Sequence, residues 1–297
     1  MRIFLDTARY KAFLVAAETR SFTKAAELLC YTPSGVSQLI NALEKEFDFA
    51  LFYRNKKGVI LTNCGEKMLP AIRTLLKQEE NIYQLAAELN GLQMGTVTIA
   101  TYLSIATHWL PKVIQTFQKN YNKIHVKLME GTHKEIDTWL ESGQVDIAFT
   151  SYIEPMNYDW ITLAENSMVA VLPPNHTFAN SKSYPLENCC NEKFIMPEQG
   201  RDDDVITMLQ KNGITPNIYF STLETFTTMP MIEQGLGISI MNELVTERLE
   251  YDVVKLPLEP PQYITLGIAA LDFKNLSPAA SHFLKYAVTH LTQQQKI

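Results

Sequence analysis

The sequence lacks the segments that mark membrane-spanning and exported proteins. No apolar run approaches the roughly 20 residues that a helix needs to cross a bilayer. The amino-terminal stretch MRIFLDTARYKAFL carries charges where a secretory signal needs an uninterrupted apolar core. We therefore expect a cytoplasmic protein with no membrane partner.

Cysteine is scarce as well. The chain has four cysteines, Cys30, Cys64, Cys189 and Cys190, and their spacing matches no metal site. An even count does not imply disulfides in a cytosolic chain, so we expect mostly buried, free thiols. The adjacent pair could sense oxidants, but neighbouring cysteines rarely reach disulfide geometry without strain. The sequence leaves the redox activity of that pair open.

The common signatures of catalysis are also missing. The six histidines are scattered without metal-ligand spacing, and there is neither a glycine-rich phosphate loop nor a nucleophile elbow. No histidine stands in the sequence where a base for a nucleophilic serine or threonine would be expected. We therefore expect no enzyme activity, no catalytic residues, no metal and no cofactor.

The composition is that of a globular protein with unevenly distributed charge. A length of 297 residues allows two domains, and 46% hydrophobic with 20% charged residues argues against a disordered or fibrous chain. The net charge is −6, yet residues 1–65 hold nine Lys/Arg and six Asp/Glu, a net +3. The basic excess therefore belongs to the amino-terminal segment.

Residues 21–47, SFTKAAELLCYTPSGVSQLINALEKEF, are predicted to form two helices joined by a tight turn. In the second helix the apolar residues recur at helical spacing, which predicts one buried face. That face comprises Val36, Leu39, Ile40, Leu43 and Phe47. Thr32 followed by Pro33 is a start signal, because the hydroxyl can cap free amides and proline fits the first helical position.

The opposite face of this second helix carries short hydrogen-bonding side chains. It comprises Ser34, Ser37, Gln38, Asn41 and Lys45. Such groups can approach base edges in the major groove without steric conflict. Gly35 costs about 1 kcal/mol of helix propensity relative to alanine, which favours close approach of the backbone to a duplex. An ordinary amphipathic hairpin in a helical core, the alternative, requires neither feature.

The segment from Leu51 to Thr62, LFYRNKKGVILT, is predicted to form two short strands around a cationic tip. This is a winged hairpin that places Arg54, Lys56 and Lys57 for phosphate contacts. Because the basic excess is modest, we expect specificity to depend on geometry and dimerisation rather than on a large positive field. The predicted DNA contacts are Thr32, Ser34, Gly35, Ser37, Gln38, Asn41, Arg54, Lys56 and Lys57.

Several motifs occur in order over residues 1–90: AAELL, TPSGVSQLINALE, LFYR and the LT-x-x-G-E sequence that ends at Glu66. Together they resemble the winged helix-turn-helix and linker helix of LysR-type transcriptional regulators. The resemblance extends more weakly through WLESGQVDIAF at 139–149 and MIEQGLGISIM at 231–241. Two residues depart from it: family members often have arginine at Gln38 and usually alanine at Gly35. Glutamine favours adenine, so the operator sequence is expected to differ.

A long helix follows the predicted wing. Thr62 can cap a helix that runs to about Asn90 and stops at Gly91, roughly 43 Å at 1.5 Å per residue. Its apolar stripe comprises Leu69, Ile72, Leu75, Leu76, Ile82, Tyr83, Ala86 and Leu89. Homodimerisation would cover this stripe, and a helix folded back on its own domain is the alternative. Pro70 should bend the helix unless it begins later.

From residue 96 onward, strands are predicted to alternate with helices. The expected strands are 96–101, 125–130, 145–149, 194–197, 217–221 and 237–241, and the expected helices are 105–120, 133–142, 202–212, 225–234 and 277–295. Two βαβαβ units in sequence imply two α/β lobes. The resemblance agrees, since the regulatory half of LysR-type proteins resembles periplasmic binding proteins.

Tandem α/β lobes leave a crevice at the carboxyl ends of their strands, where a small ligand can bind. Reading the strand ends predicts effector contacts from Thr101, Tyr102, Ser104, Thr132, Thr150, Gln199, Arg201 and Thr225. Arg201 and several helix amino termini favour an anionic or carboxylate-bearing effector. Asp202, Asp203 and Asp204 could instead pair with Arg201 and leave it structural.

The predicted fold class is therefore α/β, with a winged helix-turn-helix at 1–62, a linker helix at 63–91 and a two-lobed effector domain at 92–297. Lobe I is expected at 96–163 and 268–297, and lobe II at 164–267. The predicted function is an effector-switched, sequence-specific regulator that binds an interrupted palindrome of double-stranded DNA as a dimer or tetramer and contacts RNA polymerase. A cytoplasmic small-molecule-binding protein or an enzyme using the two lobes is the alternative.

Overall fold

The computed structural model describes residues 7–55, 58–198, 202–247 and 250–294. The chain divides into two compact units, with the main boundary between Gln93 and Met94. Among the described helices, none combines the length and the apolar character needed to cross a membrane.

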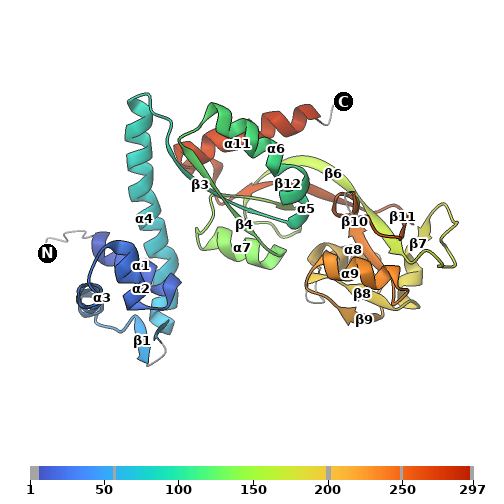
Figure 1. Ribbon diagram of the computed structural model, residues 1–297, viewed down its shortest axis with the longest axis horizontal. Helices are drawn as coiled ribbons and strands as arrows, with labels where there is room; N and C mark the ends of the chain where they lie inside the picture. Colours follow the sequence, from blue (N-terminus) through green and yellow to red (C-terminus); the bar gives the residue numbers. More distant parts are fainter. Residues whose placement is uncertain (1–6, 56–57, 199–201, 248–249, 295–297) are drawn as a thin grey trace. The chain divides into compact units, whose positions relative to one another are not determined.

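The first unit begins with three helices and a hairpin (Figure 1). The helices are α1 (Thr7–Thr19), α2 (Phe22–Leu29) and α3 (Pro33–Phe47). The strands β1 (Phe52–Asn55) and β2 (Gly58–Leu61) pair antiparallel, which confirms the predicted hairpin. Val36, Ile40 and Leu43 are buried, and Leu39 and Phe47 pack against the same core, as the helical spacing predicted.

Helix α4 (Asn63–Leu89) completes this unit. The Thr62 side chain accepts a hydrogen bond from the Gly65 amide at 3.0 Å, so the predicted cap is present. Pro70 lies inside the helix, which therefore does not begin later. The first half of α4 contributes Ile72 to the buried core. The second half carries exposed apolar side chains, Ile82, Tyr83, Leu85 and Leu89.

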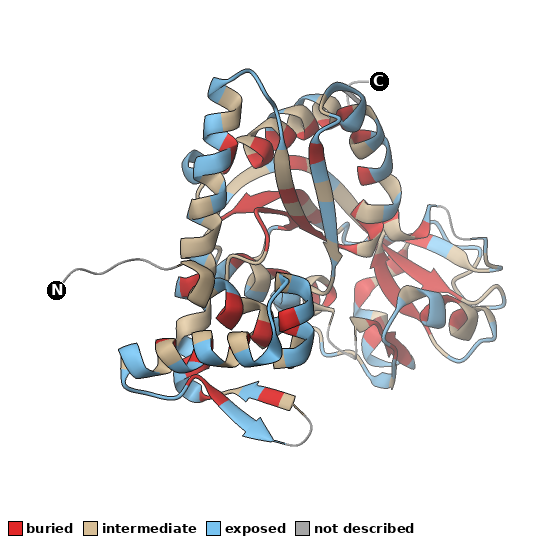
Figure 2. Cartoon of the chain, turned by 60° about the vertical axis from the view of Figure 1, so that its left-hand side comes forward, coloured by how far each residue is buried: buried red, intermediate tan, exposed pale blue. Residues whose placement is uncertain are grey.

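The second unit is built on an eight-stranded mixed sheet. Its strand order is β4-β3-β5-β12-β6-β11-β7, with β10 also pairing with β6. The strands are β3 (Gly95–Thr101), β4 (Ile124–Glu130), β5 (Ile147–Ser151), β6 (Asp159–Leu172), β7 (Tyr184–Pro185), β10 (Ser239–Asn242), β11 (Val254–Glu259) and β12 (Tyr263–Ala270). Buried residues predominate in β5, β10 and β12, and Figure 2 shows runs of buried residues in this sheet.

The first lobe of this unit contains the parallel strands β4, β3 and β5. Its helices are α5 (Leu103–His108), α6 (Leu110–Asn120), α7 (His133–Glu141) and α11 (Pro278–Gln294). The prediction of a single helix over 105–120 is wrong. The helix is interrupted at Trp109, and α6 begins after it with a proline in its first turn. Strand β5 begins at Ile147, two residues later than expected.

The second lobe contains the parallel pair β8 (Phe194–Met196) and β9 (Ile218–Ser221). Its helices are α8 (Asp203–Lys211), α9 (Thr225–Glu233), the short α10 (Glu243–Thr246) and the 3-10 helix η1 (Leu186–Cys190). A second 3-10 helix, η3 (Phe273–Asn275), precedes α11. The two expected helices and the three expected strands of this half are present, with ends shifted by one or two residues.

The long strands β6 and β12 join the lobes. Strand β6 pairs with β12 along Asp159–Ser167, with β10 from Met168 onward and with β11 from Val169 onward, and Figure 1 shows these strands side by side. The sequence patterns did not indicate β6, β7, β11 or β12. At Gly267 an added Cβ would lie 2.3 Å from the Ile161 carbonyl oxygen, so glycine permits this close pairing.

The cysteines differ from expectation. Cys189 is buried, but Cys30, Cys64 and Cys190 are exposed, so the prediction of mostly buried thiols is wrong. Cys30 ends α2 in the left-handed conformation, which places it at a surface turn. All four are free thiols.

Candidate DNA-reading surface and effector cleft

The exposed face of α3 is the first candidate site. Ser34, Gln38, Asn41 and Lys45 are exposed on this helix, while Ser37 is half-buried. The residues on the opposite face hold the helix against the core, so the polar face is presented on a fixed scaffold. Such a surface suits readout of base edges.

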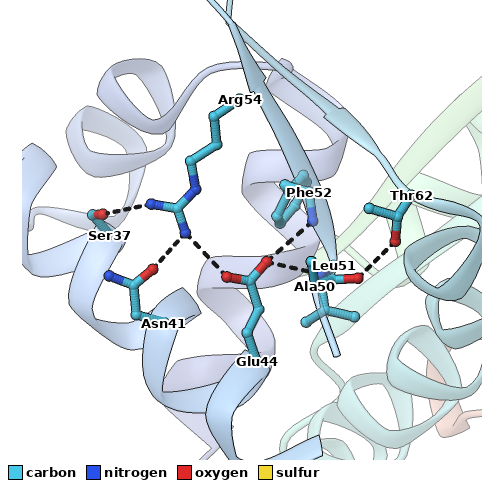
Figure 3. A network of polar contacts seen from close by, with 8 residues as sticks. All are labelled: Ser37, Asn41, Glu44, Ala50, Leu51, Phe52, Arg54 and Thr62. Atoms are coloured by element: carbon cyan, nitrogen blue, oxygen red, sulfur yellow. Dashed lines mark hydrogen bonds and ion pairs between the residues drawn. The ribbon is translucent and has the colours of Figure 1, made fainter. Parts of the chain in front are cut away.

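Arg54 connects the hairpin to this face (Figure 3). Its guanidinium donates to the Ser37 hydroxyl at 3.3 Å and to the side-chain carbonyl of Asn41. It also forms an ion pair with Glu44 at 3.1 Å and lies over the Phe22 ring at 5.1 Å. These contacts hold Arg54 against the side chains of α3, so both of its terminal nitrogens already bind groups within the domain.

Glu44 has a second function in the same network. One of its carboxylate oxygens accepts hydrogen bonds from the Leu51 amide at 2.7 Å and the Phe52 amide at 3.1 Å. The other oxygen pairs with Arg54. Glu44 therefore fixes the start of β1 on α3 and, through Arg54, fixes the outer part of the same strand (Figure 3).

The start of α3 has a local structural explanation. The Thr32 hydroxyl accepts a hydrogen bond from the Gly35 amide at 3.0 Å and lies 3.1 Å from the Ser34 hydroxyl. A Cβ on Gly35 would come 3.1 Å from the Thr32 Oγ1, a tight contact with the cap itself. Glycine at this position thus suits the cap geometry. Lys56 and Lys57 lie outside the described residues.

The second candidate site is a cleft between the two lobes of the second unit. A cavity of about 270 Å³ is lined by Tyr102, Leu103, Glu130, Gly131, Thr132, Glu135, Glu198, Leu223 and Glu224. A smaller cavity of about 70 Å³ shares several of these residues and adds Ser104, Pro197, Asp202, Asp204, Thr225, Met241, Asn242 and Val245. The strand ends of both lobes supply the lining, as expected for tandem α/β lobes.

A hydrogen-bonded network surrounds Tyr102 at one side of this cleft. The Tyr102 hydroxyl lies 2.6 Å from Nδ1 of His133 and 3.0 Å from the Ser151 hydroxyl. The Thr150 hydroxyl lies 3.4 Å from the same histidine nitrogen. The Ser151 side chain also interacts with the Asp204 carboxylate of the second lobe, where it partly offsets the rise of the Asp204 pKa. The network therefore joins both lobes. Burial raises the Tyr102 pKa well above its ordinary value.

Every charged side chain in the described lining of these two cavities is a carboxylate. Burial, together with repulsion from Asp202, Asp203 and Asp204, raises the pKa of Glu198 to about 9. Burial also raises the pKa of Asp204, with a further contribution from Asp202. On the facing lobe, burial and then Glu224 raise the pKa of Glu130. Like charges therefore face one another across the cleft.

Each of the two candidate sites lies in a segment that matches a known protein family. Residues 7–66 match the model described as a bacterial regulatory helix-turn-helix protein of the lysR family, and residues 90–292 match the LysR substrate binding domain. The chain belongs to the LysR family of transcriptional regulators.

This regulator is similar over its whole length to curated and solved relatives. It is 34% identical over 287 residues to the uncharacterized HTH-type transcriptional regulator YvbU of Bacillus subtilis, covering 95% of this chain and 98% of YvbU. A full-length OxyR from Pseudomonas aeruginosa superposes with a TM-score of 0.74 at 18% identity, covering 97% and 98% of the two chains. CbnR, solved in complex with its target DNA, superposes with a TM-score of 0.66 at 18% identity, covering 97% of this chain and 100% of the CbnR chain. At these identities the two structures support the fold.

The structure brings part of the predicted effector set together in the regulator's cleft. Tyr102 and Thr132 line the larger cavity, and Ser104 and Thr225 line the smaller one. Thr101 is fully buried, with its hydroxyl donating to the Tyr102 carbonyl, and lines neither described cavity. Thr150 lines neither described cavity, but its hydroxyl contacts His133, which in turn contacts the Tyr102 hydroxyl. Gln199 and Arg201 lie outside the described residues.

Sequence reasoning missed the acidic lining. Glu130, Glu198 and Glu224 all lie at or just after strand ends, where the small polar residues were sought. The same positional rule would have found them had it not favoured hydroxyl side chains. Leu103 and Leu223 were missed because an apolar residue at a strand end has no distinctive sequence signal.

Proposed function

We propose that this LysR-family regulator reads DNA with the exposed face of α3, and that an effector in the cleft between its lobes switches that activity. The observation that carries the proposal is the two-sided α3, with Val36, Ile40 and Leu43 buried and Ser34, Gln38 and Asn41 exposed. Gln38 is the side chain suited to a bidentate contact with adenine.

We assign Arg54 a positioning role rather than the phosphate contact expected from sequence. Its guanidinium already binds Ser37, Asn41 and Glu44 of the domain. Lys56 and Lys57, the neighbouring cations in sequence, remain the proposed phosphate contacts of the wing. Thr32 acts on α3 through its cap, and Gly35 fits beside that cap.

We further propose that the protein is a homodimer, or a tetramer built from such dimers. Ile82, Leu85 and Leu89 lie on the second half of α4, and all three are exposed in the single chain. A second copy of the helix would bury them. A dimer would place two copies of α3 in successive major grooves of an interrupted palindrome.

Effector binding would change the relative placement of the two DNA readers and so alter DNA bending or contact with RNA polymerase. We propose that the chain acts in the cytoplasm as a regulator and not as an enzyme, with functional boundaries at 1–62, 63–91 and 92–297. The anionic effector expected from sequence draws no support from the described cleft lining, which is rich in carboxylates.

Footprinting of the purified full-length protein on the DNA upstream of its own gene tests this proposal. We expect two protected half-sites whose centres are separated by a whole number of DNA helical turns, with about 10–10.5 bp per turn. A Gln38→Ala variant should alter the preferred half-site, whereas Lys45→Ala, at the far end of the same helix, should largely preserve it. Failure to protect any fragment, together with turnover of a metabolite, would revive the enzyme alternative.

A further inference from the structure

The cleft between the lobes is acidic on both walls. Glu130 and Glu135 belong to the first lobe, and Glu198 and Glu224 to the second, and all four line the larger cavity. Asp202 and Asp204 line the adjoining one. Among the described residues that line these two cavities, none is lysine, arginine or histidine. Arg201 lies outside the described residues.

Two of the helix amino termini at the cleft are already occupied by the protein's own side chains. The Asp202 carboxylate accepts from the Val205 amide at 3.1 Å at the start of α8. At the start of α7, the Glu135 carboxylate accepts from the Thr132 amide at 2.9 Å. These termini would otherwise attract an anion. Here the chain supplies the negative charge itself, which removes the main reason to expect an anionic ligand.

The carboxylates do not form a metal site within the described part of the chain. No group of three or more His, Cys, Asp or Glu side chains there has an arrangement that could hold a metal ion. The acidic groups are distributed around a cavity of about 270 Å³, which suits a small organic molecule better than a bare ion.

Apolar side chains border the acidic region. Leu103 and Leu223 line the larger cavity, and Leu223 is 58% exposed in the free protein. Phe226, which is 57% exposed, lines a neighbouring apolar cavity of about 40 Å³ together with Leu103 and Val245. A ligand with both a charged end and a hydrocarbon part would cover these groups on binding.

We propose that the effector of this regulator is a small organic cation, a protonated amine or guanidinium that carries an apolar segment. The charged group neutralises the facing carboxylates of the two lobes, and the apolar segment covers Leu223 and Phe226. This inference rests on the proposed effector-binding function and specifies its ligand class. It also supplies a physical reason for closure, because a cation converts repulsion between Glu130 and Glu224 into shared attraction.

The raised pKa of Glu198 agrees with this assignment. Glu198 faces Asp202, Asp203 and Asp204 of α8 and Glu224 before α9, and these groups together with burial raise its pKa. A cation would lower that pKa and release protons, because the charged carboxylate is then favoured. Calorimetry in two buffers of different ionisation enthalpy should therefore report net proton release at pH 7 on amine binding.

Thermal unfolding of the full-length protein without DNA tests the ligand class. The probes are pentylamine, pentane-1,5-diamine and agmatine, with pentanoate and pentan-1-ol as matched uncharged or anionic compounds, all at fixed ionic strength. We expect at least one cation to raise the melting temperature saturably by about 2 °C or more, with no response to pentanoate or pentanol. A response to pentanoate, or none to any of the three cations, overturns the proposal.

Variants separate binding in the cleft from general attraction of cations to an acidic protein. The double variant Glu198→Gln, Glu224→Gln should weaken amine binding at least tenfold. Glu187→Gln removes one charge from an exposed site in η1, outside the described cavities, and should leave binding unchanged. Equal amine binding by both variants would contradict the proposal. Footprinting of the same preparations reports DNA binding separately, so a wrong ligand class is distinguished from a wrong function.

Discussion

Arg54 of the wing hairpin lies 3.1 Å from the Glu44 carboxylate of α3, and the same guanidinium reaches Ser37 and Asn41. Two of the side chains expected to face DNA bases are therefore oriented by a residue on a different element. We therefore propose that Arg54 contributes to base readout indirectly, through the side chains that it holds.

An Arg54→Ala variant should consequently change sequence preference as well as affinity. Release of Ser37 and Asn41 is expected to reduce discrimination at a contacted base pair by about 1–3 kcal/mol. The stability cost should stay within about 1 kcal/mol, since the Arg54 side chain is 41% exposed and solvent screens its ion pair with Glu44. Selection of binding sites from a random DNA pool gives the measurement. A uniform loss on all sequences, with the salt slope lowered by about one, would instead identify Arg54 as a phosphate contact.

Glu44 is expected to matter mainly for folding. A Glu44→Ala change leaves the Leu51 and Phe52 amides without their side-chain acceptor, which should cost about 1–3 kcal/mol. Glu46→Ala is the matched control, because Glu46 makes a surface ion pair with Arg9 and should change stability by about 0.5 kcal/mol or less. Urea unfolding followed by circular dichroism compares them, and similar midpoints for the two variants would count against this role.

Tyr102→Phe should disturb the cleft with little change in shape. The hydroxyl contacts with His133 and Ser151 are lost. We expect destabilisation of about 1 kcal/mol and weaker effector binding, with DNA affinity in the absence of effector nearly unchanged. Parallel measurements of unfolding and of amine binding test this. Unchanged amine binding would show that Tyr102 serves the fold alone.

The raised pKa of Glu198 predicts the pH dependence of stability. The folded state holds this proton up to about pH 9, whereas the unfolded chain releases it near the ordinary value of 4.5. The associated stability is fully present below that ordinary pKa and is lost as pH rises toward 9. Glu198→Gln should therefore flatten the decline of melting temperature between pH 5 and 9 relative to Glu187→Gln. The same decline in both variants would refute the assignment.

Helix α4 provides a test of assembly. Charge placed at Ile82 and Leu89 should prevent burial against a second copy, so Ile82→Glu with Leu89→Glu should shift the protein toward a monomer. Gln93→Glu adds charge at an exposed position just beyond the helix and should leave the oligomeric state unchanged. Light scattering after size-exclusion chromatography measures the mass, and an unchanged oligomer in the double variant would place the interface elsewhere.

Some elements could be predicted from sequence because their signals are local. The buried and exposed faces of α3 follow from residues three and four apart, and the Thr62 and Thr32 caps follow from neighbouring residues. The strands β6 and β12 escaped prediction because their partners lie about a hundred residues apart, and no short pattern records that pairing. Trp109 breaks a helix that periodicity alone would have continued.

The sequence by itself determined the family, the two-sided recognition helix, the wing and the alternation of strands and helices, since each depends on short-range periodicity or on motifs in order. Tertiary structure decided which side chains meet. It brought Arg54 into contact with Glu44 of α3, and it placed Glu130 of one lobe in the same cavity lining as Glu198 and Glu224 of the other. Electrostatic energy depends on distance through space, so the charge of the effector cleft could be read only after the distant strand ends had come together.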